Sequence, residues 1–188
     1  MNDPAAPKVQ HRAVWAARCA AVILLAVGCS ISIAHTLGIR MFALVQPTEN
    51  LLAEWSYFAA FVLIIAGLVL IARIPDSSWL SLWAAIVVGV AGAALTAYVG
   101  FLMMFGLLYA TNPLTYLYAA AILFIAVAPL LSGFLGLLLI RWNASRSSEV
   151  RVRTALVASG GVAVLTIIAL ITCRFVLNPV IYGAVGGS

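Results

Sequence analysis

The fold of this chain is decided by residues 77–140, which read SSWLSLWAAIVVGVAGAALTAYVGFLMMFGLLYATNPLTYLYAAAILFIAVAPLLSGFLGLLLI. This stretch contains no charged side chain, and it is interrupted once, at Thr111-Asn112-Pro113. The segments on either side of the interruption each exceed the roughly 20 apolar residues that a helix needs to cross a bilayer. We therefore predict two transmembrane helices that are joined by a tight turn.

The composition extends this prediction to the rest of the chain. Of the 188 residues, 65% are hydrophobic and only 8% are charged, whereas a soluble domain carries about a quarter charged residues. The net charge of +5 does not indicate a nucleic-acid partner, because the basic residues lie at the ends of apolar segments, where they act as topology signals. This composition is typical of a polytopic membrane protein.

Five apolar segments predict an all-α fold, a bundle of five transmembrane helices. The expected helices cover about 13–39, 51–73, 79–110, 114–141 and 153–177. They form a membrane domain over 13–178, with a flexible cytoplasmic N-terminus over 1–12 and a short external tail over 179–188. The first segment follows basic residues as a signal peptide does, but it continues too far, and we interpret it as an uncleaved helix.

Some helices carry local features with structural consequences. The third would be ~46 Å long, longer than a ~30 Å hydrocarbon core, so we expect it to tilt, project from the membrane, or bend at Gly100 or Gly106. Asp76, Ser77 or Ser78 is placed to cap its start. Pro129 predicts a kink in the fourth helix, and Asn178-Pro179 is expected to end the fifth.

The distribution of basic residues predicts the orientation of the bundle. With five crossings, eight of the ten Lys and Arg residues fall on one side, and only Arg40 and Arg174 fall on the other. Because an excess of Lys and Arg in short loops marks the cytoplasmic side, we expect the N-terminus inside and the C-terminus outside. The expected location is a bacterial cytoplasmic membrane, where membrane lipids surround the bundle.

Ionisable groups near the predicted outer face form one candidate ligand site. Glu54 lies about one turn inside the second helix, Arg174 lies one turn before the end of the fifth, and His35 and Tyr57 lie at a similar level. Since a charge at bilayer depth costs roughly 2.5–3.5 kcal/mol, pairing of Glu54 with Arg174 or His35 would be favourable. Two readings stay open: a small polar pocket for a headgroup, a quinone edge or an ion, or interfacial side chains that reach water.

The predicted loop between the fourth and fifth helices is a second candidate. Arg141, Arg146, Arg151 and Arg153 lie in or beside it, and each Arg near an anionic leaflet contributes about 1 kcal/mol. We predict contact with lipid headgroups or with a partner, although the positive-inside rule alone also explains these residues.

Small residues recur at helical spacing and predict close packing of helices, since association in lipid relies on packing. Such a face serves either packing within the chain or contact with another membrane subunit or a second copy of the chain. The glycines concerned are Gly89, Gly92, Gly100, Gly133, Gly136, Gly160 and Gly161.

Several functions are disfavoured by the sequence. His11 and His35 are 24 residues apart, or ~36 Å along a helix, so one chain cannot ligate a haem with both. No carboxylate lies at the middle of a predicted span, which weakens ion-coupled transport, and no phosphate loop, Ser/His/Asp set or metal-ligand pattern occurs. We predict no cofactor and no metal, and a non-catalytic membrane subunit or interaction protein; the alternative is a small transporter or a lipophile-binding protein.

Overall fold

The computed structural model describes residues 6–37, 51–75, 77–108 and 112–182, apart from the side chains of residues 6–11, 51–54, 106 and 182. All regular secondary structure in these ranges is helical. The elements are α1 (Ala6–Leu37), α3 (Leu51–Arg73), α4 (Ser78–Leu107), α5 (Pro113–Trp142), α6 (Ser148–Thr172), the π-helix η1 (Cys173–Leu177) and α7 (Asn178–Tyr182). Five helical stretches in this part of the chain are long and apolar enough to span a membrane.

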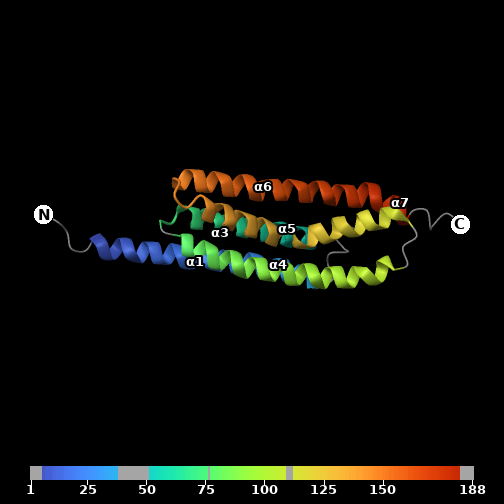
Figure 1. Cartoon of the computed structure of the whole chain (residues 1–188), viewed down its shortest axis with the longest axis horizontal. Helices are drawn as coiled ribbons and strands as arrows, with labels where there is room; N and C mark the ends of the chain where they lie inside the picture. Colours follow the sequence, from blue (N-terminus) through green and yellow to red (C-terminus); the bar gives the residue numbers. More distant parts are fainter. Residues whose placement is uncertain (1–5, 38–50, 76, 109–111, 183–188) are drawn as a thin grey trace.

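The long helices run back and forth along a common axis, so their ends gather at two levels (Figure 1). One level holds the first half of α1, the end of α3, both ends of the α5–α6 connection and the start of α4. We call it the basic end, because most of the described Arg residues lie there: Arg12, Arg18, Arg73, Arg141, Arg146, Arg151 and Arg153. Arg174 lies near the other level, which we call the far end.

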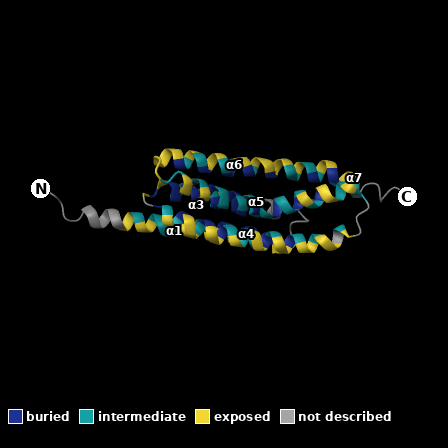
Figure 2. Ribbon diagram, in the orientation of Figure 1, coloured by how far each residue is buried: buried dark blue, intermediate teal, exposed yellow. Residues whose placement is uncertain are grey.

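Helices α3 and α5 form the centre of the bundle, and α4 and α6 lie at its periphery. In the most apolar window of α5 56% of the residues are buried, against 17% in α4 and 22% in α6. Figure 2 shows buried residues concentrated on the central helices and exposed residues along the outer sides of α4 and α6. Many aliphatic and aromatic side chains are exposed on these two helices, so their outer sides are largely apolar.

Two helices begin where a side chain caps their first turn. Asn112 Oδ1 accepts a hydrogen bond from the Leu114 N–H at 2.9 Å, and Pro113 occupies the first helical position, where it needs no N–H donor. Ser147 Oγ accepts from the Val150 N–H at 3.4 Å, so α6 begins at Ser148, several residues before the expected start. In α6 the charged residues Glu149, Arg151 and Arg153 precede the apolar span but lie within the helix.

Other helix ends also differ from the expected ones. Helix α1 begins at Ala6, so half of the segment that we expected to be flexible is helical. The chain continues in helical form through Asn178-Pro179 as far as Tyr182. The π-helix immediately before explains this continuation: the Asn178 N–H donates to the Cys173 carbonyl five residues back, and this wider turn leaves more room for the ring of Pro179 than an α-turn does.

The third and fourth predicted spans differ in their continuity. Helix α4 is one α-helix of 30 residues, ~45 Å long, and no break occurs at Gly100. Ser77 occupies its N-cap position without a side-chain cap bond; Asp76 lies outside the described residues. Helix α5 carries the buried Pro129, and Figure 1 shows α5 changing direction along its length.

Candidate functional site

The most connected polar groups of the described chain surround a backbone carbonyl that Pro129 leaves without its helical donor. In an α-helix the carbonyl of residue i accepts from the N–H of residue i+4, and proline has no N–H. The Ile125 carbonyl of α5 is therefore deprived of its partner. The Tyr57 hydroxyl of α3 donates to it at 2.6 Å, and both residues are fully buried.

Further polar side chains from α1, α3 and α6 complete what we call the tyrosine cluster (His35, Thr36, Ser56, Tyr57 and Thr166). Thr36 Oγ1 lies 3.0 Å from the Ser32 carbonyl and 3.4 Å from the Ala126 carbonyl, the next one along α5. Ser56 Oγ lies 3.4 Å from His35 Nδ1, and the rings of His35 and Tyr57 are 5.6 Å apart. Thr166 Oγ1 donates to the Val162 carbonyl at 2.7 Å, and its side chain lies beside that of Tyr57.

The tyrosine cluster thus joins α1, α3 and α5 by hydrogen bonds at one level of the bundle, with Thr166 of α6 beside it. Of the four predicted ligand-site residues, the structure brings His35 and Tyr57 together. The side chain of Glu54 lies outside the described residues. Arg174 lies eight residues beyond Thr166, ~12 Å along the helix axis, and its guanidinium carbon lies 5.9 Å from the centre of the Phe175 ring. Sequence reasoning missed Thr36, Ser56 and the Ile125 carbonyl.

The four arginines of the predicted lipid-contact loop divide into two groups. Arg141, Arg146 and Arg153 are exposed at the basic end. Arg151 is only 7% exposed, and its Nη1 donates to Ser77 Oγ in the α3–α4 connection at 3.5 Å. Arg151 therefore connects α6 to the start of α4. Its side chain is buried in the bundle, unlike those of the other three arginines.

The seven predicted packing glycines divide into three groups by what surrounds them. A Cβ atom on Gly89, Gly133 or Gly136 would lie 2.9, 3.1 or 2.5 Å from a side chain of another helix, so these three are closely packed within the chain. At Gly92 it would make ordinary contact, at 3.7 Å from Leu130. Nothing lies within 4 Å of such an atom on the remaining three, which we call the open glycines: Gly100, Gly160 and Gly161.

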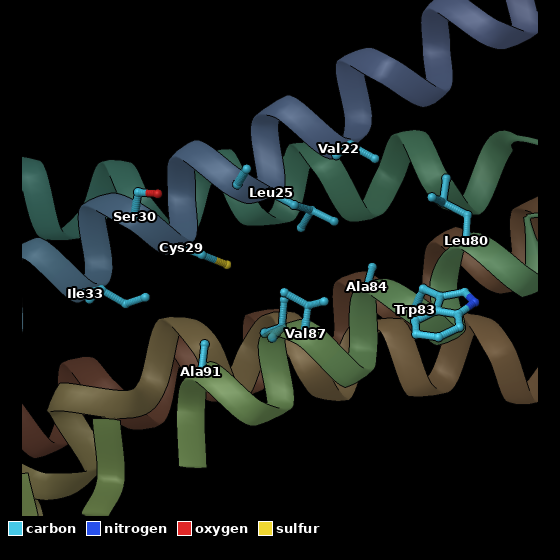
Figure 3. Close-up of a pocket in the computed structure, with 12 residues that line it drawn as sticks. Val22, Leu25, Cys29, Ser30, Ile33, Leu80, Trp83, Ala84, Val87 and Ala91 are labelled. Atoms are coloured by element: carbon cyan, nitrogen blue, oxygen red, sulfur yellow. The ribbon is translucent and has the colours of Figure 1, made fainter. Parts of the chain in front are cut away.

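An apolar groove runs between α1 and α4, which hardly touch because α1 packs on α3 and α4 packs on α5. Its volume is about 450 Å³. Figure 3 shows side chains of both helices directed across this space, with Cys29 and Ile33 facing Val87 and Ala91. The lining residues are Val22, Leu25, Ala26, Cys29, Ser30, Ile33, Leu80, Trp83, Ala84, Val87, Val88 and Ala91.

No group of three or more His, Cys, Asp or Glu side chains within the described ranges is arranged to hold a metal ion. Comparison of the chain with protein-family models, with curated proteins and with solved structures gave no match.

Proposed function

We propose that this protein is an integral membrane protein of the bacterial cytoplasmic membrane, with five crossings and the basic end in the cytoplasm. The exposed apolar surface of α4 and α6 supports insertion, since a water-facing surface of this size would be unstable. Exposed tryptophans at the two levels fit the interfacial belts of a bilayer: Trp15, Trp79, Trp83 and Trp142 at the basic end and Trp55 toward the far end. The excess of Arg at the basic end gives the orientation.

Cysteine labelling in intact cells tests this topology. In a background without the three native cysteines, Ser145→Cys in the α5–α6 connection is expected to react only after the membrane is permeabilised. Ser188→Cys at the C-terminus is expected to react from outside with an impermeant maleimide. Labelling of both positions from the same side would contradict the five-crossing arrangement.

Within the membrane, the proposed role is non-catalytic: the protein packs against another membrane subunit or a second copy of itself. The observation that carries this proposal is the open pair Gly160 and Gly161 on α6, where close approach of another backbone meets no side chain. Large apolar side chains flank this pair, with Val157, Val164 and Leu165 all more than half exposed. This outer α6 face, defined by residues 157, 160, 161, 164 and 165, has the composition of a helix–helix interface.

A bulky substitution on the outer α6 face distinguishes binding of another chain from packing within this chain. Gly161→Leu places its side chain in open space, so the isolated chain is expected to keep its thermal stability, while a complex formed through the outer α6 face is expected to dissociate. The measurement is the size of the particle extracted in a mild detergent, by light scattering coupled to size exclusion. The matched control is Gly100→Leu, the same change at an open glycine of α4; an unchanged particle for Gly161→Leu would refute α6 as the interface.

A second candidate function is the binding of a small lipophile or solute at the far end, through His35, Glu54, Arg174 and Tyr57. It is supported by the contact between the His35 and Tyr57 rings. It is weakened by the use of the Tyr57 hydroxyl in joining α3 to α5. Under this alternative, Glu54→Gln and Arg174→Ala are each expected to abolish ligand protection against thermal unfolding; if neither variant changes that protection, the site is excluded.

A further inference from the structure

We propose that the groove between α1 and α4 holds one acyl chain of an anionic phospholipid from the leaflet at the basic end, with the phosphate bound by Arg18. This inference rests on the proposed membrane insertion and adds a defined lipid site to it. It concerns a different part of the molecule from both the outer α6 face and the tyrosine cluster.

The length and chemistry of the groove fit a single hydrocarbon chain. On α1 the lining runs from Val22 to Ile33, and on α4 it runs from Leu80 to Ala91. Each span covers eleven residue steps, ~17 Å of helix, which is close to half of a ~30 Å hydrocarbon core. The groove is therefore about as long as one leaflet is thick, and its walls are almost entirely apolar.

The groove is too thin to enclose a helix. A helix with its side chains is about 10–12 Å across, whereas a volume of about 450 Å³ spread over ~17 Å of length leaves a much thinner channel. Several lining residues are themselves exposed, among them Val22, Val87 and Trp83. The channel is thus open along its side to whatever surrounds the bundle, and in a bilayer that is lipid.

Arg18 supplies the charge that selects an anionic headgroup. It lies one helical turn before Val22, and the spacing 18, 22, 26, 29 and 33 places it on the stripe of α1 that lines the groove. Its Nε is buried, and in the described part of the chain it has no hydrogen-bond partner. A guanidinium has five donors in a planar fork that matches phosphate, and because the Nε is buried, a phosphate at this end of the groove would be bound through the two terminal nitrogens.

Trp83 is placed to contribute at the same end of the groove. It lines the groove close to Leu80, and Figure 3 shows its indole nitrogen on the side of the ring nearer Leu80. An indole N–H is a donor only, and tryptophan favours the level of the headgroups. The groove is therefore polar and cationic at one end and apolar over the rest of its length, which is the pattern of an anionic phospholipid.

Fluorescence quenching by brominated lipids tests this site directly. The probe is a full-length variant in which Trp83 is the only tryptophan, the other four being Phe, in vesicles that contain brominated phosphatidylglycerol or brominated phosphatidylcholine at equal mole fraction. We expect phosphatidylglycerol to quench more strongly, and Arg18→Gln to lower its relative association constant about fivefold. Arg73→Gln, the same change in an exposed arginine at the end of α3 that does not line the groove, is expected to leave it unchanged.

The outcomes separate the lipid site from the membrane proposal. Equal quenching by the two lipids, or equal effects of Arg18→Gln and Arg73→Gln, would overturn the site while leaving insertion intact. Absence of quenching by either lipid would contradict insertion itself. A groove-filling variant, Ala84→Leu, provides an independent check, because it is expected to lower quenching by phosphatidylglycerol without removing any charge.

Discussion

The crossing of α1 with α3 and the outer α6 face both carry glycines, yet they differ in what lies beside those glycines. At the crossing, a Cβ on Gly28 would lie 2.8 Å from Ile64 Cγ1 and 3.1 Å from the Ala60 carbonyl oxygen. On α6, a Cβ on Gly160 or Gly161 would meet nothing within 4 Å. The comparison teaches that a glycine in an apolar helix marks a surface suited to close approach, while only the fold shows whether this chain already occupies that surface.

The crossing is reciprocal, and this explains why α1 and α3 lie so close together. Gly67 of α3 faces α1 just as Gly28 of α1 faces α3, and its Cβ would lie 2.8 Å from Leu25 Cγ and 3.1 Å from the Ala21 carbonyl oxygen. Each helix thus offers a glycine to the other's backbone, at two points along the same interface. The contacts are with backbone as well as side chain, so small rotamer changes cannot relieve an added methyl group.

The largest predicted effect is therefore at the crossing. Gly67→Ala is expected to destabilise the protein by about 1–3 kcal/mol, the range for overpacking a well-filled interior. Gly28→Ala is expected to behave alike, and thermal unfolding in detergent followed by circular dichroism measures both. The matched control is Gly161→Ala, the same substitution in open space; a loss of stability at Gly161 equal to that at Gly67 would contradict the distinction between the two regions.

The next effect concerns the hydrogen bond that joins α3 to α5. Tyr57→Phe leaves the Ile125 carbonyl buried without a donor, and we expect a loss of about 1–2 kcal/mol. Pro129→Ala restores an N–H that can pair with this carbonyl within α5. The Tyr57→Phe effect is therefore expected to shrink in the Pro129→Ala background.

A double-mutant cycle measures this coupling, since it isolates the interaction between the two sites. Thermal unfolding of the native protein, both single variants and the double variant provides the four stabilities. Additive effects of the two substitutions would show that the Tyr57 hydroxyl does not replace the helical donor that Pro129 lacks.

A smaller effect is expected at the basic end, where buried and exposed arginines differ as the glycines do. Arg151→Gln removes the bond to Ser77 and the packing of a buried side chain, with an expected loss of about 0.5–1.5 kcal/mol. Arg153→Gln, which is exposed on the same turn of α6, is expected to change stability by less than about 0.5 kcal/mol. Urea or thermal unfolding distinguishes them, and equal effects would place Arg151 among the surface arginines.

Much of the helical arrangement could be predicted from the sequence, because charge is costly in an apolar layer and therefore bounds each apolar span. The expected span 51–73 coincides with α3, and Asn112-Pro113 gave the start of α5. The start of α6 and the continuation through Pro179 were missed. A charged residue can extend a helix beyond the apolar layer, and a π-turn can accommodate a proline, so neither charge nor proline fixes a helix end by itself.

The pairing of the helices could not be predicted, because it depends on contacts between distant segments. The glycine pattern drew attention to α4, α5 and α6, while the closely packed Gly28 and Gly67 went unnoticed. Pro129 does indicate that the carbonyl four residues earlier lacks its helical donor, but nothing in the sequence shows that Tyr57 replaces this donor. The position of Arg151 was missed for the same reason: its partner Ser77 is 74 residues away.

The smallest predicted effect is that of Gly160→Ala, and it tests whether the open glycines of α6 form an interface with another chain. Gly160→Ala is expected to raise the stability of the dispersed chain by up to about 1 kcal/mol, because alanine favours a helix over glycine and the new methyl group meets no neighbour. In an assembly formed through the outer α6 face, the same methyl group would separate the two backbones and weaken association. We therefore expect Gly160→Ala to unfold at a higher temperature in a dispersing detergent and to yield a smaller particle in a mild one. Lower stability of the dispersed chain would show that the space beside Gly160 is already filled, and an unchanged particle would mean that lipid alone covers this face.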